Sequence, residues 1–113
     1  MIKNTTKKTI LMQQSAVMRS HFEKSTGLMF HDRVSKGLVF PFGKPRKIIL
    51  HMMFVFCPID VLFLDKNNKI VEIKESLQPF SFYSSKHNAS TFIELPDGKI
   101  KATKTKVGDK VSF

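Results

Sequence analysis

The stretch "IDVLFLDKNNKIVEIKE", residues 59–75, predicts two β-strands joined by a tight turn, and the rest of the fold is built outward from it. Residues 59–65 are apolar on both faces of the predicted strand apart from two aspartates. Residues 69–75 alternate apolar and charged side chains, which is the period of a half-buried strand. The intervening Lys-Asn-Asn suits a hairpin loop because asparagine tolerates a positive φ.

The same signals of β structure continue along the chain. Further strands are predicted at residues 9–13, 38–42, 47–52, 91–96 and 99–106, with a short one closing the chain after residue 107. Asp97-Gly98 is the strongest short hairpin signal. Residues 15–27 instead predict a short helix, with Ser15 as its N-cap and Gly27 at its C-terminal end. Many short strands without a βαβ pattern predict a mainly β fold, a small antiparallel barrel or sandwich with one short N-terminal helix.

Length and composition bound the class of protein. A chain of 113 residues, 42% of them hydrophobic, is long enough for one domain with a real core. We expect residues 1–8 to be a frayed basic N-terminus and residues 9–113 to form the single domain. Cys57 is the only cysteine, which excludes an intramolecular disulfide. The longest apolar run, residues 48–64, contains polar residues and is too short for a membrane span, so we expect a cytoplasmic protein without a membrane partner.

The net charge of +10 keeps nucleic acid among the candidate partners. Sixteen of the nineteen basic residues are lysines, however, and only three are arginines with the planar fork that reads bases. The densest group of lysines is Lys99, Lys101, Lys104, Lys106 and Lys110. If residues 99–106 form a strand, this row either lies along a phosphate backbone or, as we favour, guards an edge strand from pairing with another chain.

Four segments, taken in order, resemble a known family. They are "GLMFHDR" (27–33), "PIDVLFLDKNNKIVEI" (58–73), "IELPDGK" (93–99) and "VGDKV" (107–111). Together they are similar to the DUF192 family of small archaeal and bacterial proteins. The resemblance implies a mainly β, barrel- or sandwich-like fold with one short helix, and it brings no activity, cofactor or substrate. Many bacterial members have Met-Lys-Asn-Thr where residues 52–55 are Met-Met-Phe-Val, so a site that uses those polar groups is not expected here.

Asp60 is the leading candidate for a site residue because its neighbours on both faces of the predicted strand are apolar. A buried carboxylate either gains a proton or finds a partner. In the functional interpretation, Asp60 is a general base or a ligand-binding carboxylate in a pocket. In the structural interpretation, which we favour, it pairs with a cation or caps backbone N–H groups after Pro58. Arg33, from the first segment of the resemblance, is its predicted partner.

Two methionines, Met29 and Met52, join Arg33 and Asp60 as candidate ligand-binding residues. Met29 belongs to a Gly-Leu-X-Phe pattern that recurs ten residues later along the chain. Flexible, polarisable methionines and phenylalanines are able to line a pocket for an apolar or sugar-like ligand. Packing in the core is the competing interpretation, and it is favoured for any one of these residues.

Cys57 and His51 suggest a thiolate–imidazole pair of the kind used in nucleophilic or redox chemistry. Their spacing of six residues would separate them by about 20 Å in one continuous strand. A small buried cysteine is therefore favoured. His21, His31, His51 and His87 do not have a metal-binding spacing, so we expect no metal and no cofactor.

These observations favour a non-enzymatic β domain that binds a small ligand or a protein through a cleft near Arg33 and Asp60. The alternative is weak, sequence-independent nucleic-acid binding through the basic residues 99–110. A hydrolytic enzyme that uses Asp60 ranks last. The sequence has no pair of closely spaced carboxylates, no nucleophile elbow and no phosphate-binding loop to support it.

Overall fold

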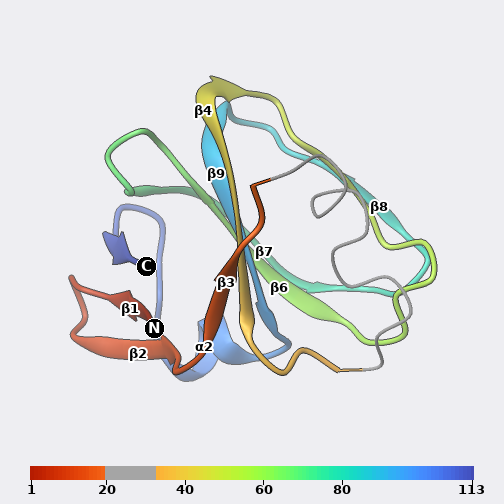
Figure 1. The fold of residues 1–113 in the computed structure, drawn as a ribbon, viewed down its shortest axis with the longest axis horizontal. Helices are drawn as coiled ribbons and strands as arrows, with labels where there is room; N and C mark the ends of the chain where they lie inside the picture. The colour runs from red at the N-terminus through yellow and green to blue at the C-terminus, as the bar shows by residue number, and fades with distance from the viewer. Residues whose placement is uncertain (20–32) are drawn as a thin grey trace.

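β-Strands dominate the computed structural model, which describes residues 1–19 and 33–113 (Figure 1). The described strands are β1 (Ile2–Asn4), β2 (Thr9–Met12), β3 (Ser15–Val17), β4 (Gly37–Arg46), β5 (Ile49–His51), β6 (Ile59–Leu64), β7 (Ile70–Leu77), β8 (Phe82–Ser84), β9 (Ala89–Pro96) and β10 (Val111–Ser112). One short helix, α2 (Lys99–Ala102), follows β9. The prediction of a mainly β fold is confirmed.

The predicted hairpin of residues 59–75 lies in a five-stranded central sheet of order β3-β4-β9-β6-β7. β6 pairs antiparallel with β7 on one side and with β9 on the other. Asn68, in the turn between β6 and β7, has a φ of 61°, as the Lys-Asn-Asn turn requires. The edge strand β3 runs parallel to β4, so the sheet is mixed rather than wholly antiparallel.

Two smaller sheets cover the two faces of the central sheet, so the molecule is a layered sandwich (Figure 1). On one face, β10-β1-β2 and α2 enclose a core that includes Leu11, Leu62 and Ile100. On the other face, the two-stranded β5-β8 sheet encloses a core that includes Leu50 and Phe63. The sheets do not close on themselves, so the barrel alternative is wrong.

Burial on both faces explains the apolar character of β6. Successive side chains of a strand point to opposite faces. Leu62 and Leu64 therefore pack in the core beneath β1 and β2, while Val61 and Phe63 pack in the core beneath β5 and β8. Asp60 shares the face of Leu62 and Leu64, which directs its carboxylate toward α2.

The N-terminus is more ordered than we expected. Instead of fraying, residues 2–4 form β1 between β2 and β10. The side chains of Ile2 and Asn4 are 0% exposed. β1 packs so closely on β4 that a Cβ added to Gly37 would lie 2.2 Å from Cδ1 of Ile2. Burial of Ile2 offsets the conformational entropy that a short N-terminal segment otherwise retains.

Two predictions of secondary structure are wrong, the helix that begins at residue 15 and the strand at residues 99–106. Residues 15–17, expected to begin a helix, form the strand β3, and the remainder of that prediction from residue 20 lies outside the described residues. Residues 99–102, expected in a strand, form α2. Gly98, with a φ of 88°, turns the chain into this helix instead of closing a hairpin.

Candidate functional site

Asp60 is buried and fully engaged by backbone groups. Its side chain is 0% exposed. Oδ1 accepts a hydrogen bond from the backbone N–H of Ser76 over 3.0 Å, and Oδ2 accepts one from the backbone N–H of Ile100 over 2.9 Å. The carboxylate thus joins the end of β7 to the first turn of α2. The structural interpretation, capping of backbone N–H groups, describes this residue.

The predicted ion pair between Arg33 and Asp60 is wrong. Arg33 is exposed, and the carboxylate of Asp60 has the two backbone partners instead. Of the two methionine candidates, Met52 is 1% exposed in the core beneath β5 and β8, as the packing interpretation holds. Met29 lies outside the described residues.

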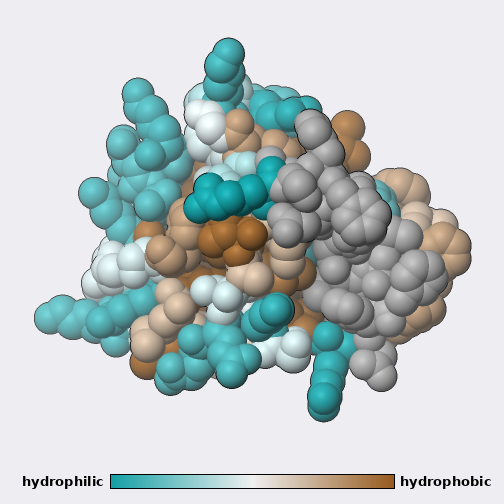
Figure 2. All heavy atoms as spheres, in the orientation of Figure 1, coloured by the Kyte–Doolittle hydropathy of each residue, from teal (hydrophilic) through white to brown (hydrophobic). Residues whose placement is uncertain are grey.

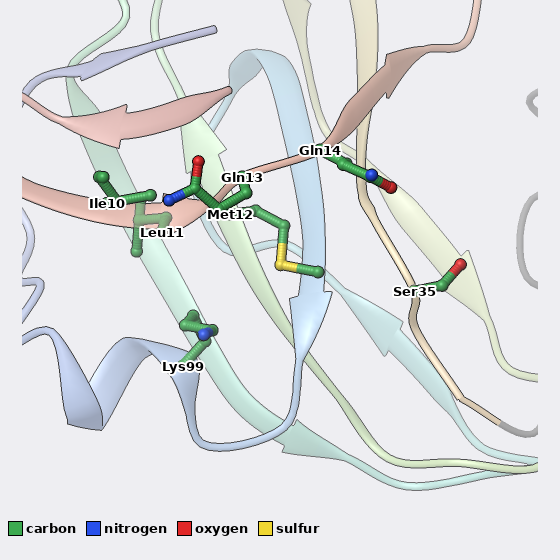
Figure 3. Close-up of a pocket in the computed structure, with 7 residues that line it drawn as sticks. All are labelled: Ile10, Leu11, Met12, Gln13, Gln14, Ser35 and Lys99. Carbon is green, nitrogen blue, oxygen red and sulfur yellow. The ribbon is translucent and has the colours of Figure 1, made fainter.

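A shallow groove of about 560 Å³ is nevertheless lined by residues that are close in sequence to Arg33 and to the backbone partner of Asp60 (Figure 3). Ser35, two residues after Arg33, lines one side of it, and Lys99, next to the Ile100 that Asp60 anchors, lines another. The other lining residues are Ile10, Leu11, Met12, Gln13 and Gln14. Figure 3 shows the Met12 side chain between Lys99 and Ser35. The groove offers one cation, several hydrogen-bonding groups and an apolar floor.

The lysine row predicted at residues 99–110 belongs to a larger basic surface, which we call the lysine end. The antiparallel pairing of β1 with β10 and a bridge between Lys69 and Lys110 bring together the basic stretches 3–8, 66–69 and 104–110. The helix α2 extends this surface toward the start of β6. Its lysines are Lys3, Lys7, Lys8, Lys66, Lys69, Lys99, Lys101, Lys104, Lys106 and Lys110. Hydrophilic side chains crowd this side of the molecule, the left of Figure 2.

Few acids offset the charge of the lysine end. Within the described residues, Lys7 is its single lysine with an ion pair, to Asp109 at 2.8 Å. Asp65 accepts hydrogen bonds from the backbone of Asn67 and Lys69 in the turn between β6 and β7. The remaining lysines therefore present an uncompensated positive field to solvent.

Glu94 is a buried acid that sequence interpretation missed. It lies in the middle of β9, opposite Leu38 of β4 and Val61 of β6, and is 9% exposed. Its carboxyl group has no hydrogen bond or ion pair to any described residue. Burial raises the pKa of Glu94 to about 8, so the group is mostly neutral at pH 7. The feature of the sequence that could have revealed this buried acid is its place inside the apolar segment of residues 91–96.

A second buried carboxylate, Glu72 of β7, is by contrast saturated with donors. Its Oε1 accepts from the backbone N–H groups of Lys86 and His87 over 2.8 and 2.9 Å and lies 3.0 Å from Nδ1 of His87. Its Oε2 accepts from the hydroxyl of Tyr83. Burial alone would raise the pKa of Glu72, but these hydrogen bonds outweigh it and lower the pKa. This network attaches the β8 segment to the central sheet.

No hydrogen bond joins Cys57 to His51, both of which lie within the described residues. Cys57 is half-buried against the core beneath β5 and β8, and His51 is exposed in β5. Within residues 1–19 and 33–113, no three histidine, cysteine or acidic side chains gather as metal ligands. Nor does that part of the chain contain a helix long and apolar enough to cross a membrane.

Comparison with known sequences agrees with the resemblance. The model of the DUF192 family, described as an uncharacterised ACR family, matches residues 2–113. A UPF0127 protein of Thermococcus sibiricus is 30% identical over 115 residues, covering 100% of this chain and 74% of its own. A UPF0127 protein of Pyrococcus horikoshii is 30% identical over 114 residues, covering 100% of this chain and 98% of its own.

Two solved bacterial structures share the fold. One, from Sinorhizobium meliloti, is described as a putative transcription regulator. It has a TM-score of 0.81 and 24% identity, over 87% of this chain and 79% of its own. The other, a protein of unknown function from Novosphingobium aromaticivorans, has a TM-score of 0.80 and 22% identity, over 88% of this chain and 74% of its own. At these identities the likeness is one of fold.

Proposed function

We propose that this chain, which belongs to the DUF192 family, is a non-enzymatic binding domain whose lysine end takes single-stranded nucleic acid. The observation that carries the proposal is the gathering of ten lysines from three separate stretches of chain, with a single described ion pair among them. Binding a polyanion to such a surface releases counterions, which supplies affinity without sequence recognition.

The type of basic residue argues for contacts to the phosphate backbone rather than to bases. All ten cations of the lysine end are ammonium groups on flexible stems, which act as point charges. Bidentate recognition of guanine relies on the arginine fork or an equally well-placed lysine pair. We therefore expect weak binding that is blind to sequence and depends steeply on salt. Single strands suit the lysine end because the groove beside Lys99 is shallow and open.

A titration of unstructured RNA and single-stranded DNA at two salt concentrations tests the proposal. The triple variant K101Q/K104Q/K106Q should bind at least about tenfold more weakly, and its salt slope should fall by roughly 2, at about 0.7 per phosphate contact. The matched control K44Q/K47Q/K86Q removes the same charge from the other side of the central sheet and should retain most of the affinity. Equal losses in the two variants would show that net charge alone is responsible.

A second candidate is a small anionic ligand in the groove near Arg33 and Asp60. The observation that favours it is Lys99, which lies beside the polar lining residues Gln13, Gln14 and Ser35. In this proposal Asp60 acts indirectly, by holding α2 and its Lys99 in place through Ile100. Inorganic phosphate and citrate should then raise the melting temperature of the wild type but not of Lys99→Gln. No rise in the wild type with either anion would overturn this candidate.

A further inference from the structure

An apolar surface lies on the opposite side of the central sheet from the lysine end. We call it the phenylalanine face. It consists of the outer side chains of the β5-β8 sheet and of the two turns at its tip. Its residues and their exposed fractions are Ile49 (75%), Phe54 (45%), Phe56 (50%), Phe80 (48%) and Phe82 (68%). Hydrophobic side chains gather at this side of the molecule, the right edge of Figure 2, near β8. Phe80 contacts both Phe54 and Phe56, and large exposed apolar side chains grouped in this way mark an interaction surface.

Two of these rings belong to residues with a left-handed backbone conformation. Phe54 and Phe80 have φ values of 61° and 57°, a left-handed conformation that is costly for bulky residues. The two turns are joined through Met52, whose carbonyl accepts from the N–H of Phe80 over 2.8 Å and whose N–H donates to Ser81 over 2.7 Å. The tip is thus a built, hydrogen-bonded structure and not a frayed loop.

The arrangement of the rings does not suit nucleic-acid bases. Phe80 lies between the other two rings of the tip, 5.9 Å from Phe54 at an interplanar angle of 71° and 5.7 Å from Phe56 at 56°. Stacking platforms present open, successive ring faces to the bases. Rings that pack at steep angles to one another instead make one apolar knob, which suits insertion into an apolar medium.

The charge of the two segments that form the β5-β8 sheet selects the kind of partner. Residues 44–58 and 78–88, which form the β5-β8 sheet and its turns, contain no aspartate or glutamate. The same two segments contain four cations, Lys44, Arg46, Lys47 and Lys86. Cations on both copies disfavour the docking of this face on a second molecule of the chain. They favour a partner that is both apolar and anionic.

We propose that the phenylalanine face attaches the protein to the surface of an anionic lipid bilayer. The rings of Phe54, Phe56 and Phe80 enter the boundary between headgroups and acyl chains, as amphipathic anchors do. Lys47 and Lys86, whose segments are joined by a hydrogen bond from Nζ of Lys47 to the carbonyl of Lys86, lie at the headgroup phosphates. Such attachment needs no membrane-spanning segment, and it is independent of nucleic-acid binding at the lysine end.

Flotation of the full chain with lipid vesicles tests the proposal. We expect binding to vesicles that contain phosphatidylserine and weak binding to pure phosphatidylcholine. The variant F54N/F80N removes two rings while giving both positions a residue that tolerates positive φ, so its fold should be retained. It should bind anionic vesicles at least about tenfold more weakly. The matched control Val107→Asn removes an exposed apolar side chain from the lysine end and should bind like the wild type.

Variants separate the two ends of the molecule. At about 0.15 M salt the Debye length is roughly 8 Å, so cations of the phenylalanine face that lie at the headgroups still attract them. Wild-type protein and K101Q/K104Q/K106Q should both float with anionic vesicles under these conditions, and F54N/F80N should not. Equal flotation of F54N/F80N and wild type would overturn the proposal. So would self-association of the wild type that is lost in F54N/F80N, because the occupant would then be a second copy of the chain.

Discussion

The Oδ2 atom of Asp60 lies 2.9 Å from the backbone nitrogen of Ile100, forty residues further along the chain, and accepts its hydrogen bond. The other oxygen of the same carboxylate, Oδ1, accepts a hydrogen bond from the backbone N–H of Ser76. One buried carboxylate therefore fixes both β7 and α2 to the start of β6. Asp60 therefore holds the backbone at Ile100, the residue next to Lys99, which lines the groove.

Replacement of Asp60 with asparagine should lower the free energy of unfolding by about 2 kcal/mol, because a buried amide NH₂ would face a backbone N–H donor. Arg33→Met should change it by less than about 0.5 kcal/mol, since Arg33 is exposed. Urea unfolding of the two single variants and the double variant should show additive losses. A coupling energy above about 1 kcal/mol between the two positions would show that Arg33 and Asp60 do interact in the folded protein.

The helix α2, which was predicted to be a strand, shows the limit of what the sequence alone predicts. The alternation in residues 69–75 and the apolar run of residues 59–64 depend on local pattern, and both strands appear where expected. Residues 99–106 also alternate, which predicted a strand. Their helical turn depends on the left-handed Gly98 and on a hydrogen bond from Ile100 to a carboxylate forty residues away, and no local pattern records such a contact.

The residues of the candidate site also divide into those that a local sequence pattern predicts and those that depend on the fold. The cluster of lysines at residues 99–110 was visible in the sequence, but its junction with Lys3, Lys8 and Lys69 required the pairing of β1 with β10. Glu94 was missed because an acid in an alternating strand is expected to face solvent. β9 lies at the centre of a sheet that is covered on both faces, so the face that normally meets water is closed.

Glu94 should make the protein less stable as pH rises. The pKa of its buried carboxyl is raised from 4.5 to about 8, so the folded state holds a proton that the unfolded state releases. The stabilising contribution is complete below about pH 4.5 and is lost progressively up to about pH 8, at a slope approaching 1.4 kcal/mol per pH unit. The isosteric variant Glu94→Gln lacks this slope and should be more stable than wild type at pH 8.

Chemical unfolding of both proteins at pH 5, 6.5 and 8 measures this effect. The other ionisable groups are common to both proteins and cancel in the difference between wild type and Glu94→Gln. A difference that stays constant across the range would mean that Glu94 finds a compensating partner in the folded protein.

Tyr83 should resist ionisation until strongly alkaline pH. Burial and the hydrogen bond to the carboxylate of Glu72 raise its pKa from 10.0 to about 12. Because Tyr83 is the single tyrosine and the chain has no tryptophan, the ultraviolet absorbance of tyrosinate reports on this residue alone. In Glu72→Gln the negative neighbour is gone, and the absorbance midpoint should move back toward pH 10. An unchanged midpoint would assign the shift to burial alone.

Asp109 should hold the two ends of the chain together, and its loss should open the β10-β1-β2 sheet first. It is 5% exposed and accepts hydrogen bonds from Nδ2 of Asn4 over 3.0 Å and from Nζ of Lys7 over 2.8 Å. Burial would raise its pKa, but hydrogen bonds from Asn4, Lys7 and the backbone of Lys106 outweigh burial and lower it. Its contribution to stability is therefore complete above pH 3.8 and is lost as pH falls through the lower folded-state pKa.

Asp109→Asn should cost about 2 kcal/mol and increase amide hydrogen exchange in β1 and β10 before the central sheet is affected. Lys7→Gln should cost less, roughly 0.5–1 kcal/mol, because the lysine is partly exposed to solvent. Lys8→Gln is the matched control. It removes the same charge from the next position, where no ion pair is formed within the described chain, and should leave exchange in β1 unchanged. Equal amide hydrogen exchange in Lys7→Gln and Lys8→Gln would show that Lys7 acts through its surface charge and not through the ion pair with Asp109.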